Sequence, residues 1–162
     1  MKNALVIIDI QNDYFPGGAF PLERAEEACR NAVLAINKAK EEGWLVIGIQ
    51  HVATPDAPFF RPGSEGTEIH HSVAAALGNA TVLQKREADS FYGTGLEELL
   101  RGAGVTDLWL TGMMTQHCVT HTALSSQASG MNVHIVSAGC AAPSKAISDL
   151  ALSGLSVRCK VE

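Results

Sequence analysis

The feature that most constrains the fold of this chain is an alternation of short apolar runs with longer stretches of helical periodicity. Residues 4–8 form an unbroken aliphatic run, which is typical of a strand that is buried on both faces. Residues 23–42 carry small and apolar side chains at intervals of three and four, so we expect an amphipathic helix that stops at Gly43.

The same alternation continues to the end of the chain. The apolar runs predict further strands at 44–49, 81–83, 108–110, 133–136 and 157–161, and the helical patterns lie at 96–103, 116–129 and 145–152. Strands that alternate with helices predict an α/β fold, a doubly wound and mostly parallel sheet with helices on both faces. A chain of 162 residues without a linker or low-complexity tract is expected to form a single domain over 1–162.

One segment does not fit this alternation. Residues 52–71 contain three prolines, two glycines and the pair Phe59-Phe60. A loop of this length within a small α/β domain is usually functional or disordered. We therefore predict that it forms a lid over a pocket, with its aromatic side chains exposed.

Composition excludes several classes of function. The chain has 12 Lys and Arg against 17 Asp and Glu, a net charge of −5, and no basic cluster, so we expect no nucleic-acid partner. The first apolar run is too short for a signal sequence or a membrane span, and the four cysteines form no Cys-x-x-Cys pair. We expect a cytoplasmic protein with reduced thiols and no membrane partner.

Chemically useful side chains follow the predicted strands. Ligands of open parallel sheets bind at the carboxyl ends of the strands. Asp9, His51 and Lys85 follow the first three predicted strands, and Cys118 lies shortly after the fourth. Each has a structural alternative: Asp9 could cap a turn, and Lys85 could be a solvated residue of a charged surface stretch.

Cys118 is the strongest single candidate. With Thr115 as the N-cap, Cys118 is the third residue of the predicted helix, where the helix dipole would lower the pKa of its thiol. The alternative is a small core hydrophobe, which we expect for the other three cysteines, Cys29, Cys140 and Cys159.

The histidines suggest little metal chemistry. His117 and His121 have the spacing of helical metal ligands, but Cys118 stands where the His-Glu-x-x-His motif requires glutamate. His134 lies within a predicted strand and is expected to be packed. His70 and His71 are adjacent and are expected to point in different directions.

Three blocks together carry a family resemblance. They are Asp9-Ile-Gln-Asn-Asp-Tyr14, Lys85 followed by Ser90-Phe91-Tyr-Gly-Thr94, and Gly112-Met-Met-Thr-Gln-His-Cys-Val119 with Thr122-Ala123. In this order the blocks resemble the isochorismatase-like cysteine hydrolases, over about residues 3–142.

The resemblance implies a catalytic triad of Asp9, Lys85 and Cys118. It also implies a cis peptide bond between Met113 and Met114 and an oxyanion hole formed by the N–H groups of Met114 and Cys118. Seven further residues are expected to contact the substrate: Gln11, Tyr14, Phe15, His51, Phe91, Met113 and His117. Phe59 and Phe60 are further candidates for the pocket wall, although each aromatic residue could equally belong to the core.

The sequence also departs from the family pattern. Nicotinamidases of this family carry an Asp-x-His metal motif after the second strand, where this chain reads Gln50-His51-Val52-Ala53. We therefore expect no metal and no cofactor, and nicotinamidase activity becomes a weaker expectation. Ala138-Gly-Cys140 replaces the usual Asp-Ala-Cys, and the segment after it is short, so packing or assembly there is expected to be unusual.

The expected activity is cysteine-dependent hydrolysis of a carbon–nitrogen bond in a small amide or ureide, through a thioester. We also expect a homo-oligomer, a dimer or tetramer. Two alternatives stay open. One is an isochorismatase-type ether hydrolase, and the other is a catalytically silent binding or assembly domain with the same fold.

Overall fold

Six strands form one parallel sheet in a computed structural model, which describes residues 2–162. Their order is β3-β2-β1-β4-β5-β6, and each neighbouring pair is parallel. The strands are β1 (Asn3–Ile8), β2 (Leu45–His51), β3 (Thr81–Lys85), β4 (Asp107–Gly112), β5 (Asn132–Ile135) and β6 (Lys160–Val161). The expected doubly wound sheet is confirmed.

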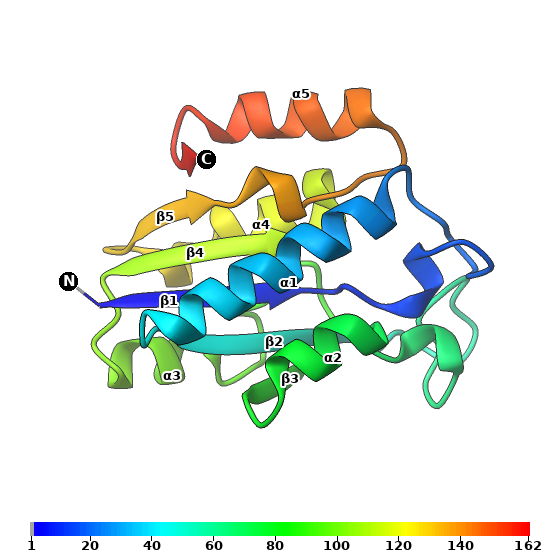
Figure 1. The fold of residues 1–162 in the computed structure, drawn as a ribbon, viewed down its shortest axis with the longest axis horizontal. Coiled ribbons are helices and arrows are strands. Elements are labelled where there is room, and N and C mark those ends of the chain that lie inside the picture. Colours follow the sequence, from blue (N-terminus) through cyan, green and yellow to red (C-terminus); the bar gives the residue numbers. More distant parts are fainter. Residues whose placement is uncertain (1) are drawn as a thin grey trace.

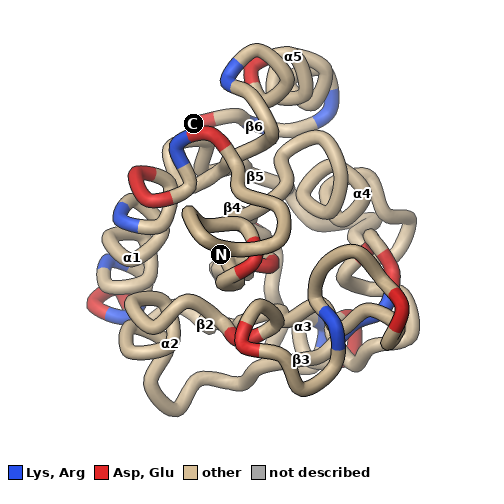
Figure 2. The backbone as a smooth tube through the Cα atoms, turned by 90° about the vertical axis from the view of Figure 1, so that its right-hand side faces the viewer, with Lys and Arg blue, Asp and Glu red and all other residues tan. Residues whose placement is uncertain are grey.

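Helices cover both faces of the sheet (Figures 1 and 2). The helices are α1 (Ala25–Glu41), α2 (His71–Leu77), α3 (Leu96–Gly102), α4 (Thr120–Ala123) and α5 (Lys145–Leu155). In the end-on view of Figure 2, α1 and α2 lie on one side, α3 and α4 on the other, and α5 lies beside the β6 edge. Between residues 2 and 162, no helix has the length and apolar character needed to cross a membrane.

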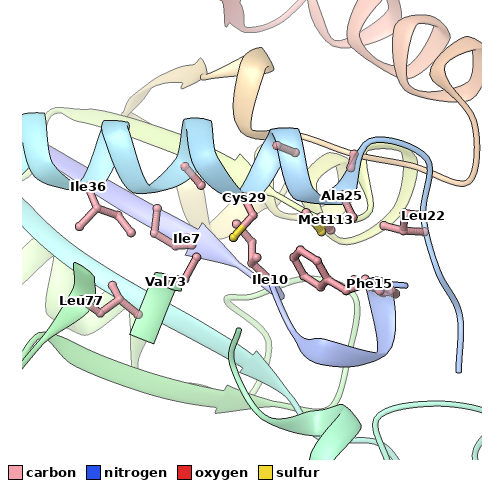
Figure 3. Close-up of a cluster of buried hydrophobic side chains, with 14 of the residues drawn as sticks. Ile7, Ile10, Phe15, Leu22, Ala25, Cys29, Ile36, Val73, Leu77 and Met113 are labelled. Carbon is pink, nitrogen blue, oxygen red and sulfur yellow. The ribbon is translucent and has the colours of Figure 1, made fainter. Parts of the chain in front are cut away.

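The apolar run of β1 builds both halves of the core. Successive side chains of a strand point to opposite faces, so an unbroken apolar run suits a central strand. Leu5 and Ile7 pack under α1 and α2, where Figure 3 shows Ile7 among Cys29, Val73 and other core residues. Val6 and Ile8 face the layer that contains α3 and α4.

The strand order reverses between β1 and β4, and this places the site. The chain adds β2 and β3 on one side of β1 and then returns to add β4 on the other. Ile8 pairs with Ile49 on one side and with Gly112 on the other, so the segments after β1, β2 and β4 meet at one edge. Gly112 has φ of +132°, and a Cβ there would collide with the carbonyl oxygen of Ile8. Only glycine allows this close approach.

Two segments differ from expectation. The helix expected at 116–129 is broken into a π-helical turn (Thr115–Val119), the short α4 and a 3-10 turn (Ser126–Ala128). The unexpected helix α2 begins at His71, at the end of the predicted loop. This helix has only seven residues, so its apolar periodicity was too short to predict a helix from the sequence.

The lid expected at 52–71 is a packed loop. The carboxylate of Asp13 accepts hydrogen bonds from the N–H groups of Phe60, at 2.7 Å, and Ala19, at 3.0 Å. Phe60 is buried, and Phe59 is partly buried against it. The expectation of exposed aromatic side chains on this loop is therefore wrong for Phe60, because Asp13 ties its backbone inward.

Candidate active site

Asp9 lies at the carboxyl end of β1 and is completely buried. Its φ of +52° is in the left-handed region, which is uncommon for a residue with a side chain. Its N–H donates to the carbonyl of Ile49 at 3.2 Å, which fixes this turn to β2. The structural alternative for Asp9, a carboxylate that caps a turn, is wrong, because neither carboxylate oxygen accepts a backbone hydrogen bond among residues 2–162.

Lys85 ends β3 and brings the site together. Its Nζ lies 2.9 Å from Oδ2 of Asp9 and 3.3 Å from Sγ of Cys118. It also donates to the carbonyl oxygen of Glu87 at 2.8 Å and lies 2.9 Å from Nδ1 of His51. Lys85 is buried, so the alternative of a solvated surface lysine is wrong. The sequence did not predict this burial, because Lys85 lies at the end of a strand and its partners are distant in the sequence.

Cys118 lies in the π-helical turn that follows β4. The peptide bond between Met113 and Met114 is cis, and Met114 is the residue before the turn. The sequence predicted Thr115 as a side-chain cap, and this prediction is wrong. The hydroxyl of Thr115 instead pairs with that of Ser148 at 2.7 Å. π-Helical turns of this kind often occur at functional sites.

The resting state of Cys118 differs from the expectation. Burial, followed by the negative charge of Asp9, raises the pKa of its thiol, and the Lys85 ammonium only partly opposes this. The expected lowering of the pKa is therefore wrong, because the thiol is enclosed and the long helix that would supply the dipole is absent from 116–129. At neutral pH the resting pair is a thiol beside a Lys85–Asp9 ion pair.

The two carboxylate oxygens of Asp9 are available to take a proton. Apart from the ion pair with Lys85, neither has a hydrogen-bond partner among residues 2–162. Burial lowers the pKa of Lys85, but the charges of Asp9 and Cys118 and hydrogen bonds to them raise it overall. The lysine therefore stays charged, and it favours a thiolate whenever the Cys118 proton moves to Asp9.

His51 ends β2 beside the other three side chains. Burial, and then the neighbouring charge of Lys85, lower its pKa to about 4. One ligand-type atom each from Asp9, His51 and Cys118 lies within 4.8 Å of the others. His51 is thus a neutral imidazole that adjoins the thiol, the carboxylate and the ammonium group.

An open hollow borders this cluster, and we call it the vestibule. It has a volume of about 610 Å³. Its lining residues are His51, Arg86, Glu87, Ala88, Asp89, Tyr92, His117 and His121. Of the seven expected substrate contacts, the vestibule includes His51 and His117.

Gln11 does not fit the expected role of a substrate contact. Its amide nitrogen donates to the carbonyl oxygens of His51, at 2.8 Å, and Thr67, at 2.7 Å, and its oxygen accepts from the N–H of His51 at 2.8 Å. Both ends of the amide are therefore occupied in joining the segment after β1 to β2. We correct its role to one of positioning the backbone of His51.

Three further expected contacts lie in the core instead. Phe15 and Met113 are buried in the layer beneath α1, as Figure 3 shows. Phe91 is buried in the opposite layer with Leu96. The sequence marked them because they adjoin the family blocks, but their apolar side chains point into the two cores.

Tyr14 is intermediate between these cases. Its ring packs against Phe60, with centroids 4.6 Å apart, and is buried. Burial raises the pKa of its phenol, and the charges of Asp9 and Cys118 raise it further. The ring therefore belongs to the core. Its hydroxyl lies close enough to the site for the negative charges of Asp9 and of an ionised Cys118 to raise its pKa.

Cys29, Cys159, His70, His71 and His134 lie outside the site. Cys29 is buried on α1, 3.5 Å from Nδ1 of His70, and Cys159 is buried in the layer of α3 and α4. His134 is packed as expected, stacked on Trp109 and 3.1 Å from Asp107. The expected divergence of His70 and His71 is wrong, because their rings stack with centroids 4.4 Å apart.

The donor set does not fit the zinc site of a nicotinamidase. At the position of the required carboxylate, the amide of Gln50 donates to Thr67 and accepts from Gln84. Asp9, His51 and Cys118 are potential ligands, but the Lys85 ammonium contacts all three. A divalent cation among them would be repelled by this charge.

Several site residues escaped the sequence interpretation. The carbonyl of Glu87 is a partner of Lys85, and Asp89 and Tyr92 line the vestibule. Their only signal was position, since Tyr92 belongs to the second family block, and Glu87 and Asp89 lie between the two parts of that block. Thr122 was quoted in the third block without a role, and its hydroxyl accepts from the N–H of Ser90, which joins the two blocks.

Comparisons with known proteins show which proteins this chain resembles. A family model described as "Isochorismatase domain" matches residues 3–161. The isochorismatase family protein YddQ of Bacillus subtilis is 38% identical over 150 residues, which cover 92% of this chain and 83% of YddQ. The streptothricin hydrolase of Streptomyces noursei is 33% identical over 130 residues, which cover 80% of this chain and 46% of that enzyme.

Solved structures share the whole fold. The nicotinamidase PncA of Bacillus subtilis superposes with a TM-score of 0.90 at 28% sequence identity. The match covers 99% of both chains. The arrangement of strands and helices around the site is therefore that of known hydrolases.

Proposed function

The chain belongs to the isochorismatase family, and on this basis we propose that it is a cysteine-dependent hydrolase of carbon–nitrogen bonds in small amides. The observation that carries the proposal is the position of the Lys85 ammonium, which contacts both the Asp9 carboxylate and the Cys118 thiol. One cation thus holds a proton acceptor and a nucleophile together in a buried site.

The first half of the reaction forms a thioester. The Cys118 proton moves to Asp9, and Sγ attacks the amide carbonyl carbon, so that a C–S bond forms and the carbonyl oxygen becomes an oxyanion. We assign the backbone N–H groups of Met114 and Cys118 as donors to this oxyanion. The C–N bond then breaks, and Asp9 returns the proton to the departing nitrogen.

The second half consumes one water. Asp9 takes a proton from the water as its oxygen attacks the thioester carbonyl, and the C–S bond breaks to release a carboxylic acid. The Asp9 proton then returns to Cys118. The balance is one amide and one water in, one acid and one amine or ammonia out. Lys85 stays protonated throughout and stabilises the transient thiolate.

An amide fits the site better than an ether. A thiol nucleophile with a proton shuttle matches acyl transfer, in which the leaving nitrogen must be protonated. The proteins named streptothricin hydrolase and nicotinamidase among the similar chains add support for hydrolysis of an amide. The missing carboxylate at Gln50 argues against nicotinamide chemistry that depends on a metal.

An ammonia-release screen over small amides and ureides tests the proposal. We expect release from at least one compound by the native chain, and none by Cys118→Ala or Asp9→Asn. Hydrolysis found only with a vinyl ether such as isochorismate, and retained in Cys118→Ala, would replace this function with that of an ether hydrolase. No turnover, together with an unreactive Cys118, would favour a silent binding domain.

A further inference from the structure

The contact between Lys85 and His51 determines where the imidazole carries its proton. Nζ lies 2.9 Å from Nδ1. An ammonium group can only donate, so Nδ1 must accept and the proton of the neutral ring must lie on Nε2. Lys85 thereby fixes both the tautomer and the direction of the remaining N–H.

We propose that His51 is a substrate-positioning residue whose Nε2–H, oriented by Lys85, binds a second acceptor oxygen on the substrate. This proposal rests on the amide-hydrolase function proposed above. It assigns His51 a role in specificity that is distinct from the attack by Cys118 and the proton transfer by Asp9.

The surroundings of His51 hold the ring rigidly. Its backbone N–H and carbonyl both bond the buried amide of Gln11, and the carbonyl also accepts from the hydroxyl of Thr67 at 3.2 Å. The ring packs beside Phe60, with centroids 5.8 Å apart. A donor that is fixed in this way loses little conformational freedom when it binds an acceptor.

The ring of His51 borders open space as well as the buried cluster. His51 lines the vestibule, and its side chain is 19% exposed. No group among residues 2–162 forms a hydrogen bond with Nε2, whereas Nδ1 is taken by Lys85. The ring also adjoins the reacting thiol, since its nearer nitrogen lies within 4.8 Å of Sγ of Cys118.

These facts define a substrate class. The preferred amides carry a carbonyl or carboxylate oxygen close to the scissile carbonyl, so that one oxygen can reach the Nε2–H during attack by Cys118. An alkyl group would leave this donor unpaired, and a protonated amine would oppose it with another donor.

Long-range nitrogen–proton NMR of the full chain tests the tautomer without a substrate. Spectra of the protein labelled with nitrogen-15 histidine, assigned with a His51→Asn control, distinguish protonated from unprotonated ring nitrogens. At neutral pH we expect His51 to carry its proton on Nε2 alone. A proton on Nδ1, or on both nitrogens, would overturn the proposal.

Two substitutions at His51 distinguish the acceptor role of Nδ1 from the donor role of Nε2. In His51→Asn the amide oxygen occupies the place of Nδ1 and keeps an acceptor for Lys85, but the distal donor is lost. In His51→Gln the amide nitrogen reaches the place of Nε2 and restores a donor. The measured quantity is the ratio of kcat/KM between two amides of equal size, one with and one without the second oxygen.

We expect the native chain to prefer the oxygen-bearing amide, and His51→Asn to reduce that preference about tenfold. His51→Gln should recover part of the preference. Denaturant unfolding of both variants reports whether they are still folded. An unchanged preference in a folded His51→Asn protein would overturn the proposal. If the native chain hydrolyses no amide while the tautomer is as expected, the proposed function fails, and the substrate role of His51 fails with it.

Discussion

Cys118 and Cys29 are both buried thiols beside a nitrogen atom, yet only Cys118 lies beside a buried ion pair. Sγ of Cys118 is 3.3 Å from Nζ of Lys85, and Sγ of Cys29 is 3.5 Å from Nδ1 of His70. Cys29 borders a hollow of about 670 Å³ on α1, and the vestibule is lined by His117, the residue before Cys118. Burial and a nearby nitrogen therefore do not distinguish the two thiols.

The difference lies in charge and in the destination of the proton. Lys85 is a cation, and Asp9 beside it has carboxylate oxygens that no other group occupies among residues 2–162. His70 is a neutral base whose Nδ1 already accepts the N–H of Ser72 at 3.2 Å. A buried thiolate needs a counter-charge and a proton acceptor close to it. Cys118 contacts Lys85, which also holds Asp9, whereas Cys29 has only the charges of Arg30 and Glu26 nearby on its own helix.

The largest expected effect is the loss of amide hydrolysis in Cys118→Ala. Removal of the nucleophile should lower kcat/KM at least about 10³-fold, because no other group can form the acyl intermediate. The matched control is Cys29→Ala, which should keep nearly all activity. Equal losses in the two variants would show that both changes act through the fold, and the distinction between the thiols would not hold.

Lys85→Met should affect both activity and folding. It leaves the Asp9 carboxylate buried without its counter-charge, which typically costs about 3–5 kcal/mol of folding free energy. A stability test by denaturant unfolding should therefore show a strong loss. The double variant Lys85→Met/Asp9→Asn removes both charges and should regain much of the lost stability while staying inactive. A single variant as stable as the native chain would contradict the buried ion pair.

The pH dependence of alkylation should separate the two thiols. Burial raises the pKa of Cys29 to about 11, so its labelling should rise about tenfold per pH unit above neutrality. The Cys118 thiolate instead forms when its proton moves to Asp9, a transfer that does not change the number of bound protons. Its labelling by iodoacetamide should therefore be nearly constant within about one pH unit of neutrality. Parallel slopes at the two sites would rule out internal proton transfer.

Chelation should have the smallest effect. Lys85 already contacts the three candidate ligands, and Gln50 lacks a carboxylate, so a metal-free preparation should keep its turnover. The measurement is amide hydrolysis after extensive dialysis against a chelator, with a zinc-replenished sample as control. Activity that disappears on dialysis and returns with zinc would revive a metal-dependent mechanism.

The sequence predicted those parts of the fold that depend on local pattern. The apolar run of β1 and the periodicity of α1 indicated a buried strand and an amphipathic helix, and both were confirmed within two residues at each end. The π-helical turn and the end of α4 at Ala123 were not predicted in this way. Thr115 in this turn bonds to Ser148, which is distant in the sequence and gives no local signal.

The site was predicted more unevenly. Topology alone brought Asp9, Lys85 and Cys118 to one edge, because each follows a parallel strand. Orientation was not available from the sequence, so Gln11 and Phe91 were interpreted as substrate contacts although they serve the framework. The direction of the Cys118 pKa shift was also wrong, since burial outweighs the effect of the short helical turn.

The most direct test of the central claim is capture of the acyl intermediate. An amide substrate found by the screen is mixed with the protein, quenched in acid within the first turnover, and digested for mass spectrometry. We predict the mass of the acyl group on the peptide that carries Cys118, and none on the peptide of Cys29. Continued hydrolysis without an adduct on Cys118, or with the adduct on Cys29, would contradict the assignment of Cys118 as the nucleophile.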